Sequence, residues 1–170
     1  MLKLVAFVIE TALFIFALWI SWFLWTFLHE LGHAVGYMLS TGDRNWHIRV
    51  GFGKRLLKTK KLSVSLFVID GCFIPDENRM DSRSKRICML AGGPIISALL
   101  VAAIAFLRFG GIAFDSEVIA LDTIEFFLNN ALFVNSVILF LSILPIRYLW
   151  GEIKGLESDG LQIFNAIKKH

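Results

Sequence analysis

The chain is predicted to be an α-helical integral membrane protein with three spans and a small β-hairpin or sheet between the first two. Of its 170 residues, 56% are hydrophobic, and sixteen are phenylalanine and five tryptophan. The mean hydropathy is +0.69, and a soluble domain of this size would not expose so much apolar surface. The apolar residues gather in three stretches, and the length suits a single membrane-embedded domain covering residues 1–170.

The first predicted span covers residues about 4–39 and is interrupted only by Glu10 and the cluster His29-Glu30-Leu31-Gly32-His33. As one helix it would be about 54 Å long, against a hydrocarbon core of ~30 Å, so it must protrude, tilt or break. It is too long for a signal peptide, and no small-residue cleavage site follows it. Glu10 is expected near the outer interface, where its carboxylate can reach water.

The polar segment that follows, residues 41–87, is strongly basic and is predicted to contain β-structure over about 45–72. Residues 46–50 and 62–68 alternate in the manner of strands, with Gly51-Phe52-Gly53 and a lysine cluster as the turn region between them. This segment is expected to lie on the membrane surface or dip into it. The lysines suit a solvated loop facing lipid, and no motif supports nucleic-acid binding, so the predicted partner is the lipid bilayer.

Two further spans are predicted over about 88–109 and 124–146, followed by a tail over 147–170. The loop between these spans carries acidic residues and no basic ones. The positive-inside rule therefore places the basic segment and the tail in the cytoplasm and the N-terminus outside. Cys72 and Cys88 would then both face the cytoplasm, where a disulfide is not expected. Asn129, Asn130 and Asn135 are expected to hold helix interfaces or to contact a substrate backbone.

The His29–His33 cluster has the spacing of a metal site. Residues four apart share one face of a helix, so both imidazoles can reach one ion, and Glu30 can take a proton from a metal-bound water. The alternative is a pair of histidines hydrogen-bonded between helices. Ionisable residues inside a membrane are usually functional, which favours the metal site.

A catalytic zinc generally has three protein ligands and an open position. His47 follows the pair too closely and falls in the predicted hairpin, and His170 is terminal. Asp159 follows the third span on the same membrane face as the histidines, and Gly160 permits a tight turn after it. From the residues alone, a ligand and a turn or helix N-cap are equally acceptable roles for Asp159. Asp70 is the second candidate.

Four motifs along the chain resemble those of the site-2 protease family of intramembrane zinc metalloproteases (peptidase family M50). They are His29–Ala34, Gly51–Gly53 ahead of Asp70-Gly71, Ala91–Ser97, and Leu144-Pro145 followed by Asp159-Gly160. The resemblance implies one zinc ion per chain, held by His29, His33 and Asp159, with Glu30 as the general base. It also implies cleavage of a transmembrane or membrane-associated peptide near the cytoplasmic face. The chain has no PDZ-like domain and is expected to be a minimal catalytic core.

The chain departs from the family pattern at three places. Ser97 and Ser142 stand where the family often has asparagine, and together with Asn135 they are the predicted substrate-binding residues. Pro145 and Asp159 are fourteen positions apart, which implies an insertion over 147–156. A catalytically silent relative with a membrane binding or regulatory role is the alternative function. A metal transporter or sensor would need more polar ligands along the spans. By analogy, the host membrane is expected to be a prokaryotic plasma membrane.

Overall fold

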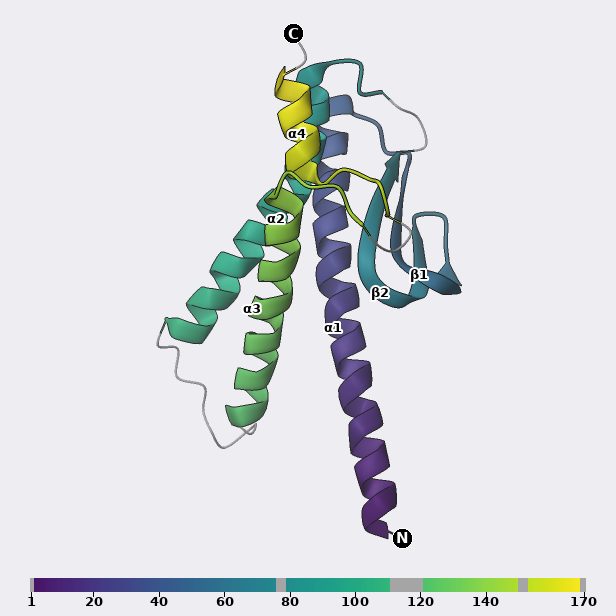
Figure 1. The fold of residues 1–170 in the computed structure, drawn as a ribbon, viewed down its shortest axis with the longest axis vertical. Helices are drawn as coiled ribbons and strands as arrows, with labels where there is room; N and C mark the ends of the chain where they lie inside the picture. Colours follow the sequence, from purple (N-terminus) through teal and green to yellow (C-terminus); the bar gives the residue numbers. More distant parts are fainter. Residues whose placement is uncertain (1, 76–78, 111–120, 150–152, 169–170) are drawn as a thin grey trace.

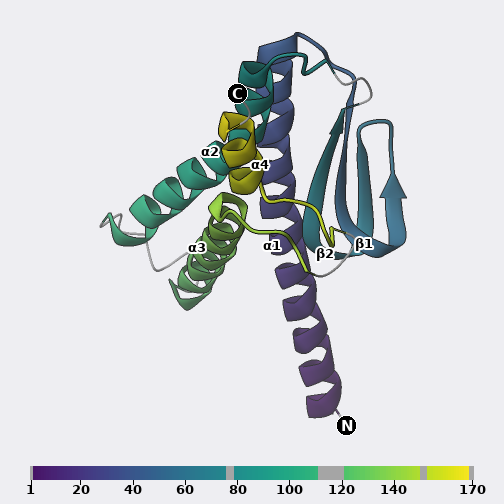
Figure 2. The same ribbon diagram turned by 45° about the horizontal axis from the view of Figure 1, so that its top comes forward.

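The computed structural model of the chain describes residues 2–75, 79–110, 121–149 and 153–168 (Figure 1). Within these residues the elements run in the order α1 (Leu2–Thr41), β1 (Trp46–Lys58), β2 (Leu62–Pro75), α2 (Arg83–Phe109), α3 (Leu121–Ile143) and α4 (Asp159–Lys168). The sheet lies along one side of α1, whereas α2 and α3 lie on the other side (Figures 1 and 2). The short helix α4 lies beyond the end of α3 and packs against α2 (Figure 1).

Among the described residues, three helices are long and apolar enough to cross a membrane. They are Lys3–Thr41, Arg83–Phe109 and Ile124–Ile143, with mean hydropathies of 2.3, 2.3 and 1.9 in their most apolar windows. α1 is continuous, and its N-terminal half extends away from the other elements (Figure 1). Leu4, Phe7 and Leu13 in this half are each more than 60% exposed. An exposed apolar surface of this extent suits a lipid environment rather than water.

Local sequence signals explain where the helices depart from the predicted ranges. α2 begins at Arg83, before the expected residue 88, because Ser82 caps the helix by accepting a hydrogen bond from the Lys85 N–H at 3.4 Å. α3 ends at Ile143, short of the expected residue 146, because a proline at 145 disfavours helical geometry at the preceding residue. The predicted tail contains a short helix, α4, which begins at Asp159.

The two antiparallel strands fold over near their middles, so the sheet is wider than a simple hairpin. Residues Ile48–Val50 have partners both in 71–73 and in 62–64. Gly51 and Gly53 adopt φ values of 81° and 83°, a region that favours glycine. The prediction that Gly51–Gly53 lies in the turn between the strands was wrong: it forms a bend inside β1. The turn itself lies at 59–61, within the lysine cluster, where the Thr59 N–H bonds to the Leu62 carbonyl at 2.7 Å.

An aromatic stripe on α1 holds the sheet in place. Trp19, Phe23 and Phe27 recur every fourth residue and stack on one another, with centroids 6.0 and 5.9 Å apart. They pack against a buried cluster formed by Ala34, Ile48, Val50, Val64 and Val68. The Trp19 indole also donates a hydrogen bond to the Leu66 carbonyl at 2.6 Å. These contacts bring β2 alongside the middle of α1.

α1 and α2 cross at a point where both helices carry glycine. A Cβ atom at Gly32 or at Gly92 would collide with the backbone carbonyl of the other glycine. A Cβ at Gly36 would likewise lie 3.0 Å from the Met89 Cα. The absence of side chains lets the two backbones touch, which brings residues 89–97 of α2 directly against the His29–His33 cluster.

Candidate metal centre

The two histidines of α1 are buried and point at the same spot. His29 and His33 are 6% and 5% exposed, and their Nε2 atoms lie 3.2 Å apart. One helical turn separates them, which places both rings on the α1 face that meets α2. The predicted convergence of the two imidazoles is therefore present in the structure.

α2 holds both rings through their Nδ1 atoms. His33 Nδ1 lies 2.9 Å from the Met89 carbonyl, and His29 Nδ1 lies 2.9 Å from the Ser97 hydroxyl. A carbonyl oxygen only accepts, so His33 Nδ1 carries a proton and, in the neutral ring, Nε2 presents a lone pair. Such a bond on the outer nitrogen is the usual way in which a metal-binding histidine is oriented.

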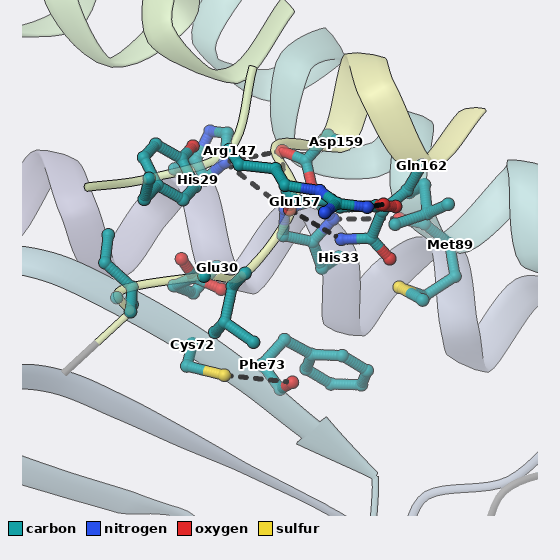
Figure 3. A pocket seen from close by; sticks show the side chains of 16 residues that line it. His29, Glu30, His33, Cys72, Phe73, Met89, Arg147, Glu157, Asp159 and Gln162 are labelled. Atoms are coloured by element: carbon teal, nitrogen blue, oxygen red, sulfur yellow. Dashed lines mark hydrogen bonds and ion pairs between the residues drawn. The ribbon is translucent and has the colours of Figure 1, made fainter. Parts of the chain in front are cut away.

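Asp159, the first residue of α4, completes the group. Its Oδ2 lies 3.4 Å from the Nε2 atoms of both His29 and His33 (Figure 3). Burial raises the pKa of Asp159, but the adjacent His33 and His29 lower it more, so its carboxyl ionises below the ordinary range. The structure thus joins residues from opposite ends of the chain at one point.

The donor set fits a zinc ion. One ligand atom from each of His29, His33 and Asp159 lies within 4.8 Å of the others. Two imidazole lone pairs and a carboxylate are all acceptors, so bringing them together is unfavourable without a shared cation or proton. Two histidines with one carboxylate make a common set for catalytic zinc, and three protein ligands leave a coordination position open.

A glycine on α2 makes room for the two rings. A Cβ atom at Gly93 would lie 2.6 Å from His33 Cε1 and 2.8 Å from His29 Cε1. Distances below 3 Å require the rings to move, so the site accepts no side chain at this position. Gly93 was noted in the sequence only as part of a motif, and its role follows from the helix crossing.

Glu30 lies next to the histidines and faces β2. It is 7% exposed and borders the same cavity as the metal-binding group (Figure 3). A Cβ at Gly71 of β2 would lie 2.8 Å from the Glu30 Cγ and 2.9 Å from its Cδ. Gly71 therefore gives the carboxylate its space, and β2 sets its position beside the centre.

A cavity of about 600 Å³ opens onto these groups. α1 contributes His29, Glu30 and His33, and further walls come from α2, β2, α4 and the loop between α3 and α4. The remaining lining residues are Gly71, Cys72, Phe73, Met89, Leu90, Arg147, Tyr148, Ile153, Gly155, Leu156, Glu157, Asp159 and Gln162. The described residues of the predicted insertion over 147–156 thus form a wall of the cavity.

The predicted substrate-binding residues lie away from this cavity. Ser97 and Asn135 are fully buried and Ser142 is 3% exposed, and none of them lines the cavity. Ser97 bonds to His29, the amide of Asn135 donates to the Ala131 carbonyl, and the Ser142 hydroxyl donates to the Leu139 carbonyl. Their role in substrate binding stays a prediction, and the contact that the structure gives Ser97 is the one with His29.

The other polar residues singled out in the sequence have structural contacts. Asn130 accepts a hydrogen bond from Ser21 of α1 at 2.7 Å, and Asn129 accepts one from Arg108 of α2 at 3.1 Å. The expectation that these asparagines hold helix interfaces is confirmed for Asn129 and Asn130.

The remaining candidate ligands lie apart from the His29–His33–Asp159 group. His47 lies in β1, with its Nε2 3.0 Å from the Ser63 hydroxyl. Asp70 is buried in β2 and does not belong to the group of ligand atoms found among the described residues. His170 falls outside the described residues.

Comparison with known proteins adds no family name. The chain matches no protein-family model, no curated protein and no solved structure. What the site does must therefore be argued from its geometry.

Proposed function

We propose that this protein is an intramembrane zinc metalloprotease of the site-2 protease kind, holding one zinc ion through His29, His33 and Asp159. The observation that carries the proposal is the meeting of these three acceptor side chains, with Glu30 beside them, at the edge of a cavity of about 600 Å³. A buried structural zinc site would not need a carboxylic acid next to its ligands or an open cavity in front of them.

The protein's own residues account for the acid–base chemistry of peptide hydrolysis. A zinc ion bound here would polarise the scissile carbonyl and lower the pKa of a water molecule. Glu30 would accept the proton of that water and pass it to the leaving amine. Ser97 and Met89 hold the outer nitrogens of the histidines, so the rings need not reorient during the reaction.

The surroundings favour a substrate from the membrane. The histidines lie on a helix that is apolar enough to cross a bilayer, and β2 forms one wall of the cavity through residues 71–73. A transmembrane helix must unwind before it can be cut, and strand residues are suited to hold the extended segment. With the basic segment 41–87 in the cytoplasm, the cut would fall near the cytoplasmic face.

The central experiment compares wild type, Glu30→Gln and Asp159→Ala in detergent, measuring zinc content and cleavage of a transmembrane peptide. We expect one zinc per chain in wild type, zinc without cleavage in Glu30→Gln, and weakened zinc binding in Asp159→Ala. Equal zinc affinity in wild type and Asp159→Ala would overturn the ligand assignment. Cleavage that survives Glu30→Gln would remove this site from the chemistry. Zinc binding by a wild type without activity would support the silent relative instead.

Gly71→Ala tests the position of the general base without changing a metal ligand. The added methyl group would push Glu30 from its position and leave the ligands untouched. Misplacing a catalytic group by about 1 Å can cost on the order of 100-fold in rate, so we expect a loss of that size in kcat with unchanged zinc affinity. An unchanged kcat would show that Glu30 does not need its observed position.

A further inference from the structure

A buried serine ties the end of α3 to the beginning of α4. Ser158 is 1% exposed. Its hydroxyl donates a hydrogen bond to the Leu144 carbonyl and accepts from the N–H groups of Ile146 and Leu161, both at 3.2 Å. One side chain thus serves as the N-cap of α4 and as a tether to the segment that leaves α3.

Backbone bonds continue this junction. The Ser158 N–H donates to the Ile146 carbonyl at 2.9 Å, and the Tyr148 N–H donates to the Leu156 carbonyl at 3.0 Å. Between these two bonds lies an ion pair in which Arg147 contacts Glu157 at 3.0 Å. These bonds hold residues 146–148 against residues 156–158, so the two ends of the segment between α3 and α4 meet directly before α4 begins.

Asp159 is held on both sides by this arrangement. Ser158 precedes it, and Gly160 follows it so close to the Ile143 carbonyl that a Cβ atom would collide with that oxygen. The direction in which the Asp159 carboxylate leaves the chain is therefore set by the contact between α3 and α4. Without the Ser158 tether, the first turn of α4 could shift relative to His29 and His33.

We propose that Ser158 is a positioning residue of the metal centre, fixing Asp159 opposite the histidine pair by tying α4 to the end of α3. This inference rests on the proposed zinc site. Loss of a residue that supports a metal ligand typically weakens metal binding by about 10–100-fold, and we expect a loss in this range.

The test measures zinc affinity of the full-length protein in detergent for wild type, Ser158→Ala and Ser158→Gly, using zinc alone as the probe. Glycine is nearly as good an N-cap as serine, so Ser158→Gly removes the tether with little loss of helix capping. The matched control is Ser142→Ala, which removes an equally buried hydroxyl whose bond stays within α3. We expect weaker zinc binding in both Ser158 variants and wild-type affinity in the control.

A double mutant distinguishes positioning from general loss of stability. If Ser158 acts through the carboxylate, adding Ser158→Ala to Asp159→Ala should lower zinc affinity no further. An additional loss there would overturn the inference, as would wild-type zinc affinity in Ser158→Gly. Absence of zinc binding in the wild type would instead refute the proposed function, so the two failures are distinguishable.

Discussion

The two halves of the candidate centre are built in opposite ways. His29 and His33 lie one turn apart on a helix of forty residues, and each ring is held by a neighbouring helix across a glycine contact. Asp159 begins a helix of ten residues and depends on the Ser158 junction. The histidine half is therefore set by local spacing and one helix crossing, whereas the carboxylate half depends on contacts between distant segments.

This difference predicts unequal tolerance to change. On the side that faces α2, the histidines are packed without free space, so one carbon atom added there should displace a ring. The loop that leads to Asp159 is partly exposed and can lose contacts at its outer end without moving the ligand. The loss of zinc affinity that a variant causes should consequently decrease with its distance from the point where α1 and α2 cross.

The largest effect is expected for Gly93→Ala. Its methyl group would overlap both imidazole rings, so we expect zinc affinity to fall by about 100-fold, the upper end of the range for lost support of metal ligands. Overpacking should also lower the free energy of unfolding by about 1–3 kcal/mol. Isothermal titration with zinc and thermal melting measure the two effects. Ala102→Val, on an exposed face of the same helix, is the control and should change neither quantity.

An intermediate effect is expected for Ser97→Ala. The variant removes the partner of His29 Nδ1 without adding volume. We expect zinc affinity to fall by roughly 10-fold, the lower end of the same range, because His33 keeps its bond to the Met89 carbonyl. Wild-type affinity in Ser97→Ala would show that the helix crossing alone orients the ring.

The smallest effect is expected for Arg147→Ala, at the outer end of the carboxylate half. Hydrogen bonds from Arg147 and Asn165 lower the pKa of Glu157. A lowered pKa stabilises the fold above the ordinary glutamate pKa, and this contribution disappears as the pH falls through the lowered value. Arg147 is exposed and Glu157 is half-buried, so the pair is partly screened by solvent; the melting temperature should fall slightly at neutral pH, with zinc affinity unchanged. The difference from wild type should vanish in acid, and a difference that persists there would exclude the ion pair as its cause.

The parts of the structure that could be predicted from sequence are those with a local signal. Hydropathy was sufficient to predict three long apolar helices. The four-residue spacing was sufficient to predict that His29 and His33 meet. α4 also has a local signal in the sequence: Ser158 is a suitable N-cap, and Leu161, Phe164 and Ile167 recur at helical spacing. These residues indicate a helix with Asp159 in its first turn.

The parts that could not be predicted depend on how distant segments meet. Nothing local to Gly93 or Gly71 reveals that one faces two imidazoles and the other a carboxylate, since each role requires the register of a neighbouring element. The same holds for Ser97, because its contact with His29 depends on the placement of α2 against α1. The bend at Gly51–Gly53 was mistaken for a turn between strands because both conformations favour glycine.

The separation of the centre along the chain has a consequence for synthesis. His33 and Asp159 are 126 positions apart, and translation proceeds at roughly 5–20 residues per second. The histidine pair therefore enters the membrane several seconds before its carboxylate partner is made. Under the proposed function, a nascent chain would carry the two histidines without a complete centre. Proteolysis would then begin only when α4 docks, and neighbouring membrane proteins would be spared during insertion.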